Sequence, residues 1–230
     1  MPSYRLTLSY DGTAFAGSQI QPGQRTVQGE LESALRRLGG LGASSTFAGR
    51  TDRGVHAFGQ VVAVTFPEWR ATAGELERAL AARLPGDIAA RQVIESDHAF
   101  NPRFDAAWRE YRYWLAPGVA SPFLGRYAWM LRDGLNSARM NQAAASLLGT
   151  HDFASFAGGG EGVPWSERAA RKRGTTRTLL RCAVRTLELT PGPGRDADAV
   201  ALEFRIAADG FLPRMVRNIT GALVEVGQGR

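Results

Sequence analysis

The stretch that decides how this chain is interpreted spans residues 47 to 60 and reads Phe47-Ala-Gly-Arg-Thr-Asp-Arg-Gly-Val-His-Ala-Phe-Gly-Gln60. Three glycines in fourteen residues are typical of a loop, because glycine adopts backbone angles that other residues avoid. Asp52 lies between Arg50 and Arg53, and we expect a carboxylate beside two cations to be ionised at neutral pH. Asp52 is therefore a candidate nucleophile or electrostatic stabiliser. A solvated hairpin loop with an Arg-Asp-Arg cluster explains the same residues.

Both sides of this loop read as strands, over residues 44–48 and 60–66. Further out, the alternation of Tyr4, Leu6, Leu8 and Tyr10 predicts a half-buried strand. Thr26 is placed to cap a helix that ends near Leu38, and Thr72-Ala-Gly-Glu75 reads as the capping box of a second helix. Residues 87–95 read as a strand. The order strand, helix, strand, strand, helix, strand is typical of ferredoxin-like (RRM-like) domains.

The second half reads strand, strand, helix, strand, strand, helix, without a repeat of individual residues. Strands are predicted over 107–115, 127–131, 179–190 and 199–207. A helix is predicted from Asn136 through Leu148, with Leu148 directed inward. The last helix is predicted to begin near Phe211 or Leu212, with Pro213 in its first turn. We therefore predict an α+β fold of two similar halves with a cleft between them.

The charge of the chain suggests a polyanionic partner. The net charge is +6, and every cation except Lys172 is an arginine, whose planar fork suits phosphate. The residues that cluster in one basic stretch are Arg168, Arg171, Lys172, Arg173, Arg177, Arg181 and Arg185. This stretch is either a solvated mobile loop or an arm that contacts RNA.

Other features narrow the class of protein. No segment is apolar over the ~18 residues that a membrane span needs, and the first residues contain no apolar signal region. We expect a cytoplasmic protein with no membrane association. The single cysteine, Cys182, excludes an intrachain disulfide and a cysteine-based zinc site. Its neighbours predict a buried thiol in a strand.

The loop motif resembles a known signature. Ala48-Gly-Arg-Thr-Asp-Arg-Gly-Val-His-Ala57, with Gly59-Gln-Val61, is similar to the signature of the TruA family of tRNA pseudouridine synthases. Further pieces of that pattern follow along nearly the whole chain: Tyr10-Asp-Gly-Thr13, Thr26-Val-Gln-Gly-Glu-Leu31, Leu84-Pro-Gly-Asp-Ile88, Phe100-Asn-Pro-Arg-Phe104, Tyr111-Arg-Tyr113, His151-Asp-Phe-Ala-Ser-Phe156, Thr176-Arg-Thr178 and Met215-Val-Arg-Asn-Ile219.

The resemblance implies a reaction and an architecture. The reaction is the isomerisation of uridine to pseudouridine at positions 38, 39 and 40 in the anticodon stem and loop of tRNA, after the target base leaves its stack. The architecture is two ferredoxin-like subdomains, residues 1–104 and 105–230, that share a continuous, mainly antiparallel sheet flanked by helices. A homodimer, no cofactor and no metal are also implied.

The resemblance assigns roles to individual residues. Asp52 matches the nucleophile, which attacks either the ribose carbon 1′ or the uracil ring. Tyr111 matches a tyrosine that stacks on the target uracil and is a candidate for removing the carbon-5 proton. Arg217 matches a basic residue that pairs with the aspartate. The predicted substrate-binding residues are Arg50, Arg53, His56, Gln60, Tyr111, Arg168, Arg171, Lys172 and Arg173.

The chain departs from the family pattern at three places. Ser18 stands where the family usually has tryptophan, and we expect weaker packing there. Arg53 stands where bacterial members usually have alanine. The chain stops at Arg230, where the family usually continues through another helix and a final strand, so we expect the second subdomain to lack both.

Three other interpretations stay open at this point. One is a non-catalytic RNA-binding protein of the same fold. Another is a family member inactivated by the shorter C-terminus. The third is a metal-dependent hydrolase that uses Asp52 and His56 with His151 or Asp152.

Overall fold

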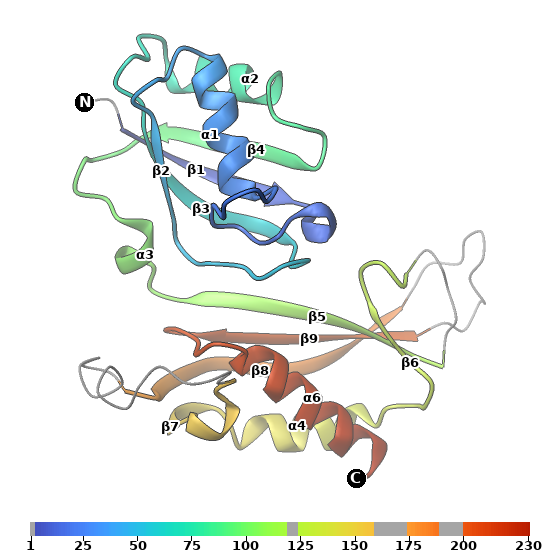
Figure 1. The fold of residues 1–230 in the computed structure, drawn as a ribbon. Coiled ribbons are helices and arrows are strands. Elements are labelled where there is room, and N and C mark those ends of the chain that lie inside the picture. The colour runs from blue at the N-terminus through green and yellow to red at the C-terminus, as the bar shows by residue number, and fades with distance from the viewer. Residues whose placement is uncertain (1–2, 119–123, 159–173, 189–199) are drawn as a thin grey trace. The chain divides into compact units, whose positions relative to one another are not determined.

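The computed structural model describes residues 3–118, 124–158, 174–188 and 200–230. The chain folds into two units, residues 1–106 and 107–230, and each is described by itself. Figure 1 shows the elements along the chain. The division into subdomains at residue 104, and a second subdomain without the family's last helix and strand, stay predictions.

The first unit has the ferredoxin-like element order that the sequence predicts. Its sheet is antiparallel, with strand order β2-β3-β1-β4, and α1 and α2 are the connections from β1 to β2 and from β3 to β4. Both helices lie on one face of this sheet (Figure 1). The elements are β1 (Ser3–Tyr10), the 3-10 turn η1 (Gly12–Ala14), α1 (Val27–Arg37), β2 (Ser44–Phe47), β3 (Ala57–Thr65), α2 (Ala73–Ala81), β4 (Ile88–Glu95) and α3 (Pro102–Asp105).

Local sequence signals set the helices of this unit. The Thr26 hydroxyl caps α1 by accepting a hydrogen bond from the Gly29 N–H at 3.2 Å. Thr72 and Glu75 form the predicted capping box at the start of α2. The apolar stripes of the helices pack on the strands to form one core, whose members include Leu6, Leu8, Leu31, Leu35, Val62, Val64, Leu76 and Leu80.

The second unit carries a five-stranded mixed sheet with strand order β6-β5-β9-β8-β7. Its pairs are antiparallel except β5 with β6, which is parallel. The elements are β5 (Arg109–Pro117), β6 (Trp129–Leu131), α4 (Ser137–Ala145), β7 (Gly149–Asp152), the 3-10 turn η2 (Ala154–Phe156), β8 (Thr176–Glu188), β9 (Val200–Ala208) and α6 (Met215–Gln228).

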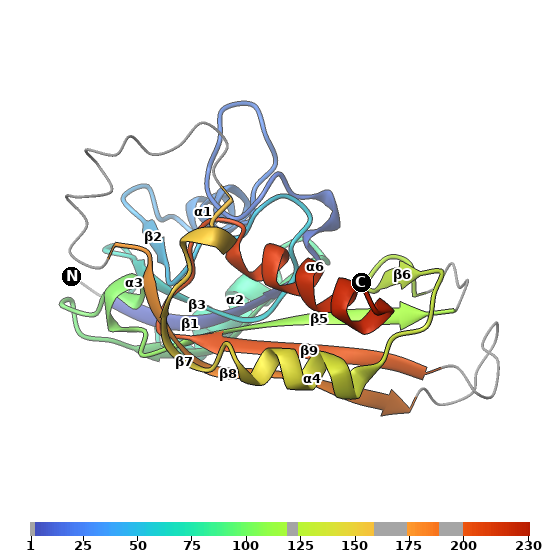
Figure 2. The same cartoon turned by 90° about the horizontal axis from the view of Figure 1, so that it is seen from below.

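Helices α4 and α6 cover one face of this second sheet, as Figure 1 and Figure 2 show. Met140 and Ile219 lie in the shared core with Phe204 and Cys182. Burial raises the pKa of the Cys182 thiol to about 12, as expected for the predicted buried cysteine. Asn141 fixes α4 to the sheet by exchanging two hydrogen bonds of 2.8 Å with the backbone of Val184.

Two predicted features of the second unit are wrong. Helix α4 ends at Ala145, and Leu148 is 42% exposed, because the chain turns at Gly149 (φ +92) to enter β7. Helix α6 begins at Met215, and Pro213 precedes it, because Arg214 has the left-handed φ of +58, which does not continue a helix.

The fold class is confirmed: an α+β chain with two helix-flanked sheets, one antiparallel and one mixed. A sheet that continues through both halves, and a cleft between them, stay predictions.

Candidate active site

The Asp52 loop, residues 48–56, connects β2 to β3 in the first unit. The side chains of Arg50, Asp52 and Arg53 are exposed. Among residues 3–118, no group forms a hydrogen bond or an ion pair with the Asp52 carboxylate. The loop therefore presents its only carboxylate to solvent, where a substrate can reach it.

Thr51, the residue before Asp52, is held by hydrogen bonds of its N–H, its carbonyl and its hydroxyl. The Thr51 N–H donates to the Ser18 hydroxyl at 2.9 Å, and the Thr51 carbonyl accepts from the Ser18 N–H at 3.0 Å. The Thr51 hydroxyl lies 2.9 Å from the Tyr10 hydroxyl. Burial raises the pKa of Tyr10, although its hydrogen bonds with Thr51 and Gln60 act the other way, so its hydroxyl stays protonated. The backbone beside Asp52 is thus fixed while its carboxylate is exposed.

Glycines allow residues 10–18 to approach the loop closely. A Cβ added to Gly12 would lie 2.1 Å from the Val55 carbonyl oxygen. Gly17 has a φ of +119, and a Cβ there would lie 2.8 Å from the Thr51 carbonyl oxygen. Neither position accepts a larger residue without a shift of the backbone. The two segments are therefore built to pack backbone against backbone.

Two residues predicted to bind substrate also brace the loop. His56 Nδ1 accepts a hydrogen bond from the Gly12 N–H at 3.1 Å and lies 3.1 Å from an Asp11 carboxylate oxygen. Gln60, on β3, donates to the Gly49 carbonyl at 2.7 Å. These contacts give both side chains a structural role. Their contact with substrate stays a prediction.

The second unit contains Tyr111 and Arg217. Tyr111, on β5, is half-buried, and its ring packs edge-on against Phe211, with 5.2 Å between ring centroids and 87° between planes. Arg217 lies in the first turn of α6 and is exposed. The stacking of Tyr111 on a base and the pairing of Arg217 with Asp52 stay predictions.

The His151–Phe156 motif braces the approach to α6. Phe153 is buried, and the Phe156 carbonyl accepts a hydrogen bond from the Asn218 side chain at 2.9 Å. The Gly158 N–H donates to the Pro213 carbonyl at 2.8 Å. This motif therefore supports the start of the helix that carries Arg217.

The basic stretch divides into two parts. Arg168, Arg171, Lys172 and Arg173 lie outside the described residues, so their predicted role stays a prediction. Arg177, Arg181 and Arg185 lie on β8, which excludes a mobile loop for these three.

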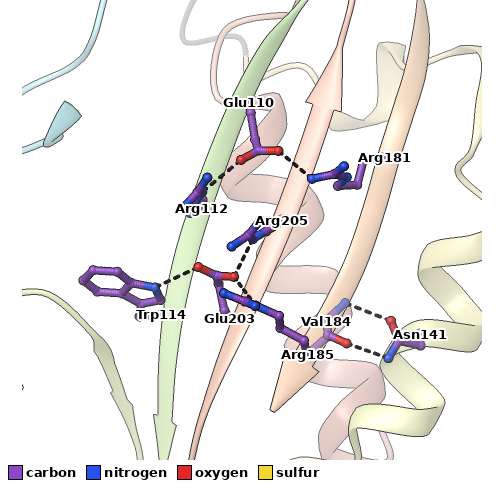
Figure 3. Close-up of polar contacts among 9 residues, drawn as sticks. All are labelled: Glu110, Arg112, Trp114, Asn141, Arg181, Val184, Arg185, Glu203 and Arg205. Atoms are coloured by element: carbon purple, nitrogen blue, oxygen red, sulfur yellow. Dashed lines mark hydrogen bonds and ion pairs between the residues drawn. The ribbon is translucent and has the colours of Figure 1, made fainter. Parts of the chain in front are cut away.

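The side of the second sheet that faces away from α4 and α6 carries a network of ion pairs, which we call the ion-paired face (Figure 3). Glu110 pairs with Arg112 and Arg181, and Glu203 pairs with Arg185 and Arg205. Glu203 is 2% exposed. Burial raises the pKa of its carboxyl, but hydrogen bonds from Arg205, Arg185 and Trp114 outweigh burial and hold the pKa at about 2. Glu203 is therefore a structural carboxylate.

The described residues contain neither a metal-binding cluster nor a membrane-spanning helix. No three side chains of His, Cys, Asp or Glu gather there in a way that could hold a metal ion. No helix in the same part of the chain is long and apolar enough to span a membrane.

Sequence reasoning missed the residues that hold the loop. The sequence marks Ser18 only as a departure expected to weaken packing, whereas in the structure it is 1% exposed and hydrogen-bonded to Thr51. The only sequence signal was a small polar residue, Ser18, that directly follows Gly17 and precedes Thr26, the cap of α1. Its partner is 33 positions away in the sequence, which no local pattern reveals.

This chain is similar in sequence to proteins of a known family. A family model described as a tRNA pseudouridine synthase matches residues 7–105 and 143–230. The relatives include proteins named tRNA pseudouridine synthase A. That of Thermosipho africanus is 39% identical over 230 residues, which are 100% of this chain and 86% of the relative. That of Geobacillus kaustophilus is 40% identical over 98% of this chain and 80% of the relative. That of Solidesulfovibrio magneticus is 42% identical over 100% of this chain and 79% of the relative.

Proposed function

The chain belongs to the tRNA pseudouridine synthase family, and from this premise we propose that it isomerises uridine at positions 38, 39 and 40 of tRNA with Asp52 as the nucleophile. As a member of this family it is an isomerase that acts on tRNA. The positions, the nucleophile, a homodimeric state and a cytoplasmic location are parts of the proposal.

One observation carries the assignment of Asp52. Its carboxylate is exposed, while the preceding residue, Thr51, is fixed by hydrogen bonds to Ser18 and Tyr10. A nucleophile must reach the substrate and must also be held close to one position. Asp52 meets both requirements, whereas Glu203, although also among arginines, is buried and paired on several sides.

The chemistry suits a single carboxylate. Isomerisation breaks the bond between uracil N1 and ribose carbon 1′ and forms a bond from carbon 5 to carbon 1′. The carbon-5 proton is lost and N1 gains a proton, so no electrons are exchanged with an outside donor. Asp52 forms a covalent adduct with either the ribose carbon 1′ or the uracil ring, and departs when the new bond is complete.

Other side chains assist in this proposal. Tyr111 stacks on the uracil and is the candidate for removing the carbon-5 proton. Arg217 orients Asp52 through a charged hydrogen bond. Arg50, which is exposed two residues before Asp52, fills the space that the target base leaves or holds its phosphate. The net charge of +6 supports binding to the phosphate backbone.

The direct test replaces the carboxylate with an amide of the same shape. We expect Asp52→Asn to bind tRNA as the wild type does and to release no tritium from tRNA labelled at uridine carbon 5. Asp97→Asn is a matched control, because Asp97 is an exposed carboxylate of the same unit, outside the loop. It should release tritium at the wild-type rate.

Two outcomes would contradict the proposal. Tritium release by Asp52→Asn at a rate near that of the wild type would reject Asp52 as the nucleophile. Tight tRNA binding by the wild-type chain without any tritium release would favour a non-catalytic RNA-binding protein.

A further inference from the structure

Ser18 links the Asp52 loop to the first helix. The residue is 1% exposed, and its hydroxyl, its N–H and its carbonyl each form a hydrogen bond. The hydroxyl accepts from the Thr51 N–H, and the Ser18 N–H donates to the Thr51 carbonyl. The Ser18 carbonyl accepts from the Gln28 N–H at 2.9 Å, in the first turn of α1. A buried serine therefore ties the loop to a rigid element.

The two bonds from Ser18 act on the peptide groups that determine where Asp52 lies. The Thr51 carbonyl belongs to the planar peptide that also contains the Asp52 nitrogen. Fixing this carbonyl and the Thr51 N–H together fixes the backbone from which the Asp52 side chain extends. The Tyr10 contact to the Thr51 hydroxyl adds a third attachment. The backbone from which the carboxylate extends is thus held by groups that do not touch the carboxylate.

The hydroxyl of Ser18 is the group that accepts the Thr51 N–H. A methyl side chain at this position could not accept it. Loss of the hydroxyl would leave the Thr51 N–H without its partner and would widen the range of positions open to Asp52.

We propose that Ser18 is a positioning residue for the reaction at Asp52 and acts through Thr51. This inference rests on the proposed function, because it concerns the geometry of the proposed nucleophile. It predicts a specific kinetic signature. Positioning of the nucleophile affects the chemical step and leaves the binding of tRNA phosphates unchanged.

The experiment compares Ser18→Ala with Ser18→Thr. We expect Ser18→Ala to lower kcat by about tenfold or more, with KM and tRNA affinity within about twofold of the wild type. Ser18→Thr retains a hydroxyl and should restore most of kcat. The Thr51 amide should exchange its hydrogen faster in Ser18→Ala than in the wild type.

Thr72→Ala is the matched control for a loss of stability. It also removes a hydroxyl that accepts a backbone N–H in the first unit, but it lies at the start of α2. We expect its kcat to equal that of the wild type. If Ser18→Ala does not fold, Tyr10→Phe, which removes another Thr51 contact, replaces it and should lower kcat without raising KM.

Several results would overturn the inference. They are an unchanged kcat in Ser18→Ala, an equal loss in Ser18→Thr, or an equal loss in Thr72→Ala. An inactive wild-type chain would instead overturn the proposed function. In that case, the exchange of the Thr51 amide would still report whether Ser18 holds the loop, because it needs no turnover.

Discussion

Asp52 and Glu203 both have arginine neighbours, but their surroundings in the structure are opposite. Asp52 follows Arg50 and precedes Arg53, yet it is exposed. Glu203 is 2% exposed and pairs with Arg185 and Arg205, with Trp114 as a further donor. In the Asp52 loop the neighbours hold the backbone, whereas on the ion-paired face they hold the carboxylate itself.

This difference separates a reactive group from a structural one. A carboxylate with both oxygens held by fixed donors, as in Glu203, is a poor nucleophile, because hydrogen bonds must break before it attacks. A carboxylate on an immobilised backbone with exposed oxygens needs no such loss. The presence of arginines beside an acidic residue therefore does not indicate its role; the location of the hydrogen bonds does.

Exchanging each carboxylate for its amide should give opposite results in two assays. We expect Asp52→Asn to lower turnover by about a thousandfold or more and to change the free energy of unfolding little. Glu203→Gln should retain turnover per folded molecule and lower the free energy of unfolding by about 1–2 kcal/mol, because two arginines lose a charged partner. Denaturant titrations and tritium release measure the two quantities.

The comparison fails if Asp52→Asn lowers stability or if Glu203→Gln lowers turnover. A large loss of turnover in folded Glu203→Gln would give that residue a part in the reaction. Marked destabilisation by Asp52→Asn would show that its carboxylate has a structural partner.

A side chain at Gly12 should disturb the support of the Asp52 loop. We expect Gly12→Ala to lower the free energy of unfolding by about 1–3 kcal/mol, because its Cβ would lie 2.1 Å from the Val55 carbonyl oxygen. Turnover should fall as well, since the loop must move. Gly86→Ala is the control, because a Cβ there meets no atom within 4 Å. Equal stability of the two variants would show that the loop adapts without cost.

Acid should reveal the contribution of Glu203 to stability. The pKa of Glu203 is about 2 in the folded chain, below its ordinary value of 4.5. Its contribution is therefore fully present above about pH 5 and is lost as the pH falls toward 2. We expect the difference in unfolding free energy between the wild type and Glu203→Gln to shrink over this interval. A constant difference would contradict the low pKa.

Features set by neighbouring residues could be predicted from the sequence. The caps at Thr26 and Thr72 depend on partners three residues away, and both are confirmed. The resemblance of residues 48–57 led to the family that the comparisons show. The start of α6 was missed because Arg214 adopts a left-handed angle that its residue type does not suggest.

Features set by distant residues could not be predicted. Ser18 and Thr51 meet only once the fold is complete. The pairing of Arg185 with Glu203 depends on the register of β8 against β9, in which these two residues lie opposite each other. The sequence alone predicted two strands and a basic stretch there, and these do not indicate which residues lie opposite each other.

The most direct test of the account is to map pseudouridine at nucleotide resolution in unmodified tRNA after incubation with the wild-type chain. The account predicts pseudouridine at positions 38, 39 and 40 wherever these are uridine, and none after incubation with Asp52→Asn. Unmodified uridine at all three positions, or pseudouridine formed only elsewhere in the tRNA, would contradict it.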